Sequence, residues 1–238
     1  MKKTTIVAGL ENSGKTTLIC SVLKEAERQS KKGAAFKPFD FALLKRNAAD
    51  QPGDGELFCQ HMQGEPMESL VSPYCANEDY PMEMSFRRDG IKLNPGVISE
   101  RIKILSGLYD FTLIESPASL MMPITEDQFM IDWIEQQSFE LIWVIHPVKN
   151  QFYQNLSEIR LLLDRNVNFN VIFNNASQSM DQDLMFYVWE KLEKYLDREI
   201  EGMMPFVKPS DDQISALGKR IEENTPGLYS RITHLPNG

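Results

Sequence analysis

The segment from Gly9 to Thr17 contains the residues whose types and spacing most clearly predict chemistry. It reads GLENSGKTT and matches the pattern G-x-x-x-x-G-K-T between Gly9 and Thr16. Glycines let a backbone approach phosphate closely, so that several N–H groups can converge on its charge. Lys15 can reach the outer phosphates of a nucleotide, and the Thr16 hydroxyl can bind Mg²⁺. The segment therefore predicts a site for a nucleoside triphosphate and Mg²⁺.

The flanking sequence supports this interpretation. The apolar run TTIVAG precedes the loop and is typical of a buried strand, while KTTLICSVLKEAE after it is typical of a helix. A helix N-terminus offers unpaired N–H groups and a favourable dipole to an anion. An ordinary glycine-containing turn is the plainer alternative. The loop residues that we expect to bind nucleotide are Gly9, Glu11, Asn12, Ser13, Gly14, Lys15, Thr16 and Thr17.

Strand-like and helical patterns alternate along the chain. The strand-like runs are 4–9, 33–38, 110–116, 140–147, 170–175 and 201–207. The helical patterns are 15–29, 98–108, 126–137, 151–165, 181–196 and 211–223, with a short helix around 54–63. Such alternation predicts a three-layer α/β P-loop NTPase fold with a mostly parallel central sheet flanked by helices. We expect one P-loop ATPase domain over 1–238, with an irregular insert at about 42–97 near the site.

Ligands of such folds bind at the carboxyl ends of the strands, so the residues that follow each strand are the candidates for the site. Lys37 follows the second strand-like run, and Glu115 lies near the end of the third. Glu115 is expected to hold Mg²⁺ together with Thr16, and Asp54 could add a third contact. The alternatives are a solvated charge for Lys37 or Glu115 and a helix cap for Asp54.

The base-binding side is predicted from the last two strands. Asn174, in FNNAS, could contact a base edge, and the segment Pro205, Phe206 and Val207 could form an apolar bed for a purine. Guanine recognition would require an Asn-Lys-x-Asp run, which NNAS lacks, so adenine is favoured. Asn174 could instead be an ordinary turn residue.

Composition limits the possible partners and compartments. The 238 residues carry a net charge of −9, which argues against general binding of nucleic acid or of an anionic membrane. No apolar run is long enough to cross a bilayer. Cys20, Cys59 and Cys75 form no C-x-x-C pair, and no signal-peptide pattern precedes them. We therefore expect a cytoplasmic protein with reduced thiols.

The order of these motifs resembles that of the dethiobiotin synthetases from residue 4 to about 207. The matching features are the loop at 9–17, KP at 37–38, GD at 53–54, SPY at 72–74, Pro81, IE at 114–115, VK at 148–149, Asn174 and Pro205. The resemblance implies ATP and Mg²⁺ as cofactors. It also implies a homodimer in which a helix N-terminus of the neighbouring subunit holds the substrate carboxylate.

The resemblance also implies a reaction and residue roles. In that family one amine of 7,8-diaminopelargonic acid takes up CO₂ to form a carbamate, which the γ-phosphate of ATP activates. The second amine then closes a ureido ring. By carry-over, Lys15 and Lys37 would be catalytic and would neutralise charge on the transferring phosphoryl group. The resemblance assigns the Mg²⁺ to Thr16, Asp54 and Glu115, and the adenine to Asn174 and 205–207.

The departures from the family lie mainly on the amine-substrate side. SPAS at 116–119 replaces a glycine-rich run, and Pro117 has no N–H to offer. Phe39 and Phe41 stand near the expected carbamate site, and Phe152 and Tyr153 stand at the helix start that would receive the substrate. The loop at 9–17 is also one residue shorter than usual. The sequence thus predicts an Mg-ATP-binding and hydrolysing protein with an altered or lost amine-substrate pocket.

Three other functions remain as alternatives. The first is a genuine dethiobiotin synthetase with an unusual pocket, and the second is a small-molecule kinase with Arg87 and Arg88 as lid residues. The third is a positioning-type ATPase that dimerises on ATP. That class has an additional lysine early in the loop, where this chain has Leu10 and Glu11.

Overall fold

The computed structural model describes residues 3–41, 52–175, 181–197, 199–200, 202–207 and 212–234. Part of the expected insert, residues 42–51, lies outside the described residues. The same is true of residues 176 and 177 of the FNNAS segment, of residues 201 and 211 at the starts of two expected elements, and of the last four residues.

A parallel six-stranded sheet forms the centre of the described fold, in the order β10-β9-β8-β1-β5-β2. Its strands are β1 (Lys3–Gly9), β2 (Gly33–Phe36), β5 (Phe111–Glu115), β8 (Glu140–Ile145), β9 (Asn170–Asn174) and β10 (Gly202–Met204). Each lies at a strand-like run of the sequence. The central strands are buried along nearly their whole length, because helices cover both faces of the sheet.

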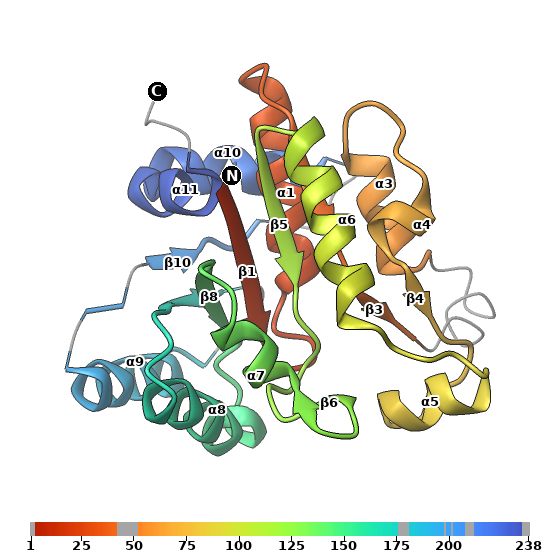
Figure 1. Ribbon diagram of the computed structural model, residues 1–238. Helices are drawn as coiled ribbons and strands as arrows, with labels where there is room; N and C mark the ends of the chain where they lie inside the picture. Colours follow the sequence, from red (N-terminus) through yellow and green to blue (C-terminus); the bar gives the residue numbers. More distant parts are fainter. Residues whose placement is uncertain are drawn as a thin grey trace.

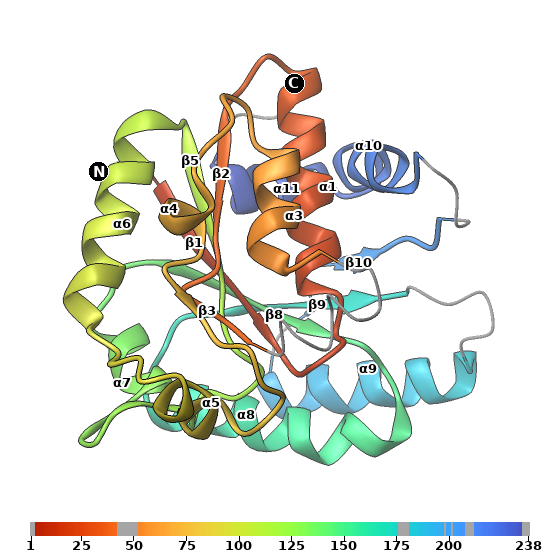
Figure 2. The ribbon, with the colours of Figure 1, turned by 90° about the vertical axis from the view of Figure 1, so that its right-hand side faces the viewer.

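Helices on the two faces complete the three layers (Figures 1 and 2). The long helices are α1 (Lys15–Arg28), α6 (Pro95–Leu108), α8 (Phe152–Asp164), α9 (Gln182–Leu196), α10 (Gln213–Asn224) and α11 (Pro226–Thr233), with the shorter α7 (Met130–Glu135). Figure 2 shows α1 and α6 on opposite sides of β5 and β2. This arrangement confirms the predicted α/β P-loop fold. Among the described helices, none combines the length and apolar composition that a bilayer crossing requires.

Close packing against α10 fixes the helix that begins at the phosphate loop. Gly218 of α10 lies against α1 so closely that a Cβ atom there would be 2.2 Å from the carbonyl oxygen of Ser21. The absence of a side chain therefore allows the two helices to approach backbone to backbone. This packing fixes the position of α1, whose first residues directly follow the loop at 9–14.

The described parts of the segment between β2 and α6 contain several short elements. They are β3 (Phe39–Asp40), α3 (Asp54–His61), α4 (Glu68–Val71), β4 (Tyr74–Cys75) and α5 (Met82–Arg88). Phe39 is buried and stacks on Tyr74, with ring centroids 6.1 Å apart, and both rings contact Phe86. The remaining short elements are β6 (Pro123–Thr125), β7 (Gln128–Phe129) and the 3-10 helix η1 (Lys149–Gln151).

Candidate nucleotide and magnesium site

The loop between β1 and α1 has the backbone geometry of an anion-binding loop. Gly9, Asn12 and Gly14 have φ angles of 150°, 57° and 94°, which all lie in the region that favours glycine. A Cβ atom on Gly9 would lie 2.4 Å from the carbonyl oxygen of Val144, so this position also requires glycine for space. A loop with residues in the left-handed region can turn successive N–H groups to one side, where they attract an anion.

Side chains hold the carbonyl oxygens of this loop. Lys15 Nζ donates to the carbonyl oxygens of Gly9 and Leu10 at 2.9 and 2.8 Å. Lys15 is only 7% exposed, and this burial lowers the pKa of its ammonium group to about 8. The ammonium form still predominates at neutral pH, so Lys15 retains the charge that binding of outer phosphates would use.

Two amide side chains hold two further loop carbonyls. Asn174 Nδ2 donates to the carbonyl oxygen of Ser13 at 2.8 Å, and Gln151 Nε2 donates to that of Glu11 at 3.0 Å. Asn174 is predicted from the sequence to contact the base, whereas Gln151 is predicted only as the first residue of the helix 151–165. The hydroxyl oxygen of Ser13 is buried and has no hydrogen-bond partner.

Four predicted site residues from separate elements meet at the carboxyl end of β5. Glu115 accepts a hydrogen bond from the Thr16 hydroxyl at 2.9 Å on one oxygen and from Lys37 Nζ at 2.8 Å on the other. Lys37 also pairs with Asp54, the first residue of α3. Burial opposes the charge of Lys37, but Glu115 and Asp54 outweigh this effect and raise its pKa above the ordinary value.

These residues fit a magnesium ion bound together with phosphates. Thr16, Glu115 and Asp54 supply a hydroxyl and two carboxylates, which are the hard oxygen donors that Mg²⁺ prefers. Within the described parts of the chain, no group of three or more His, Cys, Asp or Glu residues could hold a metal. Mg²⁺ commonly uses one or two carboxylates and takes its other ligands from phosphate and water. The glycine loop, with its buried unpaired Ser13 hydroxyl, likewise fits phosphate groups.

The predicted base-binding segment follows β10 beside the end of β9. Pro205, Phe206 and Val207 are half-buried, and their backbone is held by contacts to α10. Arg220 donates to the carbonyl oxygen of Phe206 at 3.0 Å, and Gln213 donates to that of Val207 at 3.3 Å.

The predicted substrate side is tied to α8. Ser119 donates to Glu158 Oε1 at 3.0 Å, and the Leu120 N–H donates to Glu158 Oε2 at 3.1 Å. Glu158 was not singled out in the sequence, because no local pattern marks a helix carboxylate that binds a loop 38 residues away. On α5, Arg88 pairs with Glu78 at 2.8 Å and lies over the ring of Tyr80.

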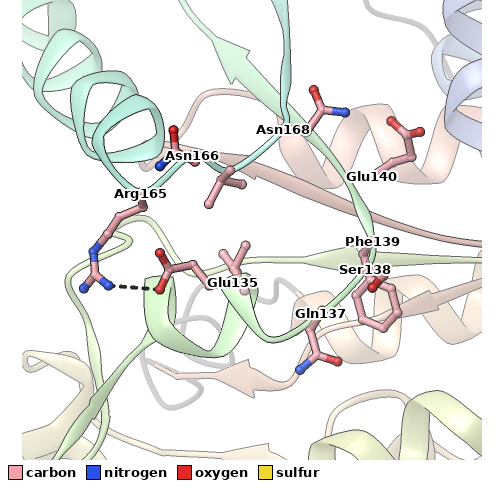
Figure 3. A pocket seen from close by; sticks show the side chains of 10 residues that line it. Glu135, Gln137, Ser138, Phe139, Glu140, Arg165, Asn166 and Asn168 are labelled. Carbon is pink, nitrogen blue, oxygen red and sulfur yellow. Dashed lines mark hydrogen bonds and ion pairs between the residues drawn. The ribbon is translucent and has the colours of Figure 1, made fainter.

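A cavity of about 400 Å³ lies at the opposite end of the sheet (Figure 3). Its lining comes from the end of α7, the start of β8 and the turn between α8 and β9. Arg165 of this turn pairs with Glu135 and Asp132 of α7. The cavity is therefore at the amino ends of β8 and β9, away from the phosphate loop.

The comparisons with known proteins agree with this fold. A family model described as "AAA domain" matches residues 3–213, and the chain belongs to this family. The chain is similar to the ATP-dependent dethiobiotin synthetase of Wolinella succinogenes, with 24% identity over 98% of this chain and 100% of that protein. The corresponding protein of Thermodesulfovibrio yellowstonii is 20% identical over 87% of this chain and 90% of its own length.

Solved structures show the same fold at lower identity. The MinC:MinD cell division protein complex from Aquifex aeolicus matches with a TM-score of 0.56 and 17% identity, over 98% of this chain and 94% of that one. Cobyrinic acid a,c-diamide synthase from Mycobacterium smegmatis, with bound ADP and magnesium, gives a TM-score of 0.54 and 13% identity, over 97% and 95%. These likenesses show the three-layer α/β P-loop fold.

Proposed function

We propose that this protein binds and hydrolyses Mg-ATP as a dethiobiotin synthetase-like enzyme whose amine-substrate pocket is altered or lost. The observation that carries the nucleotide part is the meeting of Thr16, Lys37, Glu115 and Asp54 at the carboxyl edge of the sheet, next to the loop that Lys15 contacts. ATP would supply the phosphoryl group. The two lysines would neutralise its developing charge, while Thr16, Glu115 and Asp54 would hold Mg²⁺.

Adenine is the base that this site favours. The Asn174 amide donates one of its two N–H groups to Ser13, and its Oδ1 atom is an acceptor that could take a hydrogen bond from the exocyclic amino group of adenine. The chain also lacks, from Asn174 onward, the Asn-Lys-x-Asp run that guanine recognition would require. The half-buried segment 205–207 would then cover the purine.

The residues on the substrate side support an altered acceptor. The N–H of Leu120 and the hydroxyl of Ser119 are both used by Glu158, and Pro117 has no N–H. Phe152 and Tyr153 occupy the first positions of α8, where the related enzymes would bind a small carboxylate. A compact diamino acid would find few free donors and little open backbone here.

We also propose a homodimer, as the resemblance implies. Tyr153 and Phe186, at the starts of α8 and α9, are 77% and 65% exposed, and Phe152 contacts Tyr187 between the two helices. Exposed aromatic clusters of this kind are typical of interfaces. Light scattering of the wild-type chain and of a Tyr153→Ser/Phe186→Ser variant tests this. A dimer that the variant converts to monomer supports the proposal, and a monomeric wild type contradicts it.

The reaction test compares two incubations of purified protein with Mg-ATP and bicarbonate, with and without 7,8-diaminopelargonic acid. Phosphate release and product mass are followed together, and a Lys15→Ala variant controls for contaminating ATPases. Phosphate release that is indifferent to the diamine, without dethiobiotin, supports the proposal. Formation of dethiobiotin overturns the altered pocket and establishes a genuine synthetase. Absence of ATP binding overturns the nucleotide assignment itself.

A further inference from the structure

We infer that Asn174 is a positioning residue of the phosphate loop, whose side-chain amide fixes the peptide between Ser13 and Gly14. It thereby supports phosphate binding independently of the base. This inference rests on the proposed nucleotide function and goes beyond it, because that function assigns Asn174 to adenine.

The contact between Asn174 and the loop is direct and buried. Asn174 Nδ2 lies 2.8 Å from the carbonyl oxygen of Ser13, and the two residues are 5% and 1% exposed. In a planar trans peptide the N–H points away from the carbonyl oxygen. Holding the Ser13 carbonyl toward Asn174 therefore turns the Gly14 N–H to the other side. A loop of this type binds phosphate with its N–H groups, so a reversed peptide would present an oxygen to the anion.

Gly14 provides the space for this contact. A Cβ atom at position 14 would lie 2.1 Å from Asn174 Nδ2, well inside any tolerable approach. The φ angle of Gly14 is 94°, which disfavours any side chain as well. The second glycine of the G-x-x-x-x-G-K-T pattern thus leaves room for the side chain of an asparagine that lies 160 residues later in the chain.

Asn174 is well placed to hold a loop because its own backbone is fixed. It is the last residue of β9, in register with Met204 of β10, and its carbonyl oxygen lies 3.3 Å from His146 Nδ1. The amide therefore extends from a rigid sheet and not from a flexible connection. This is the arrangement in which a single side chain can set the orientation of a neighbouring peptide.

Gln151 holds a second loop peptide in the same way. Its Nε2 atom donates to the Glu11 carbonyl oxygen, which directs the N–H of Asn12 to the other side. The backbone carbonyl oxygen of Gln151 accepts a hydrogen bond from Asn155 Nδ2 at 3.0 Å. Asn155 Oδ1 in turn accepts a hydrogen bond from the indole N–H of Trp143 at 2.9 Å. This contact is more exposed, so the buried contact of Asn174 is the one to test.

A ligand without a base separates the two roles of Asn174. Binding of Mg-ATP and of Mg-tripolyphosphate to the full chain is measured by calorimetry for the wild type, Asn174→Ala and Asn174→Asp. Loss of one buried hydrogen bond should weaken tripolyphosphate binding about tenfold in Asn174→Ala. Asn174→Asp should weaken it further, because a carboxylate oxygen would face the Ser13 carbonyl. Asn175→Ala is the matched control and should bind both ligands as the wild type does.

The outcomes are distinct. If Asn174→Ala binds tripolyphosphate as tightly as the wild type while losing ATP affinity, Asn174 acts on the base alone and the inference is wrong. The carboxylate of Asn174→Asp can accept a hydrogen bond but cannot donate one to the Ser13 carbonyl. If this variant retains wild-type ATP affinity, the donated hydrogen bond is not needed and the inference is also wrong. A wild type that binds neither ligand would overturn the proposed function together with this inference. Circular dichroism and thermal unfolding check that the variants are folded.

Discussion

Lys37 Nζ lies 2.8 Å from Glu115 Oε1, while the other oxygen of the same carboxylate accepts the hydroxyl of Thr16. One buried carboxylate therefore joins the expected phosphate-binding and magnesium-binding groups of the site. Lys37 directly follows β2, Thr16 lies at the start of α1 and Glu115 is the last residue of β5. A change in Glu115 would therefore remove a partner from both Lys37 and Thr16.

Replacement of Lys37 by Met should expose this dependence. The change leaves Asp54 and Glu115 without the ammonium group between them, and removal of one partner from a buried ion pair costs about 3 kcal/mol. We expect the free energy of unfolding to fall by about this amount, and Mg²⁺ alone to restore part of it. Urea unfolding with and without Mg²⁺ measures both effects. Lys103→Met, at an exposed site on α6, is the control. Equal Mg²⁺ responses in the wild type and in Lys37→Met would contradict the proposed metal ligands.

Replacement of Lys15 by Ala should abolish nucleotide binding and leave the fold intact. Among the described residues, the ammonium group donates hydrogen bonds to the loop carbonyls of Gly9 and Leu10 and takes no part in the apolar core, so we expect its removal to leave the core unchanged. We expect Mg-ATP affinity to fall by more than about 100-fold, since a charge-assisted phosphate contact is lost. Calorimetry with Mg-ATP and thermal unfolding without it provide the two measurements. Lys24→Ala, further along α1, should bind normally; wild-type affinity in Lys15→Ala would refute the loop assignment.

The pH dependence of stability should change in a Glu158→Gln variant. Burial raises the pKa of the Glu158 carboxyl, against the effect of its hydrogen bonds from Leu120 and Ser119. A carboxyl with a raised folded-state pKa destabilises the fold when it is ionised, and this cost disappears as the pH falls through that pKa. The stability of Glu158→Gln relative to the wild type should therefore be higher at pH 8 than at pH 5. Urea unfolding of both proteins at the two pH values tests the sign, and a constant difference would contradict it.

Two helical glycines should respond oppositely to alanine. In Gly218→Ala the new methyl group would meet the Ser21 carbonyl oxygen between α10 and α1, which should cost about 1–3 kcal/mol. A Cβ atom added at Gly107 would have no neighbouring atom within 4 Å. The stronger helix propensity of alanine should therefore stabilise α6 by about 0.5–1 kcal/mol in Gly107→Ala. Thermal unfolding of the two variants decides this. If Gly218→Ala were as stable as Gly107→Ala, the close contact between α10 and α1 at Ser21 would be contradicted.

The central sheet was predictable because its strands are nearly continuous apolar runs between turn residues. The short elements of the insert were less so. Lys37 N donates to the Val71 carbonyl oxygen and Ala76 N donates to that of Asp40, so β3 and β4 depend on contacts between distant segments. Helix α11 was also missed, since its first residues, Pro226 and Gly227, are typical of a turn.

The phosphate loop and the strand-end residues could be predicted because fold geometry brings strand ends together. The contacts that hold the loop could not. Asn174 and Gln151 lie 161 and 140 residues from the carbonyl groups they bind, and nothing in their local sequence marks that partnership. Sequence patterns locate the groups that meet a ligand, whereas the supports of those groups depend on packing.

The strand order also determines when the site can form during folding. β1 lies between β5 and β8, so the strand that leads into the phosphate loop gains its neighbours only after residues 111–115 and 140–145 are available. The Asn174 contact comes later still. At a synthesis rate of about 5–20 residues per second, roughly ten to thirty seconds separate the loop from this partner. Pairing over such a sequence separation is intrinsically slow, and the phosphate loop cannot gain this support before residue 174 is made.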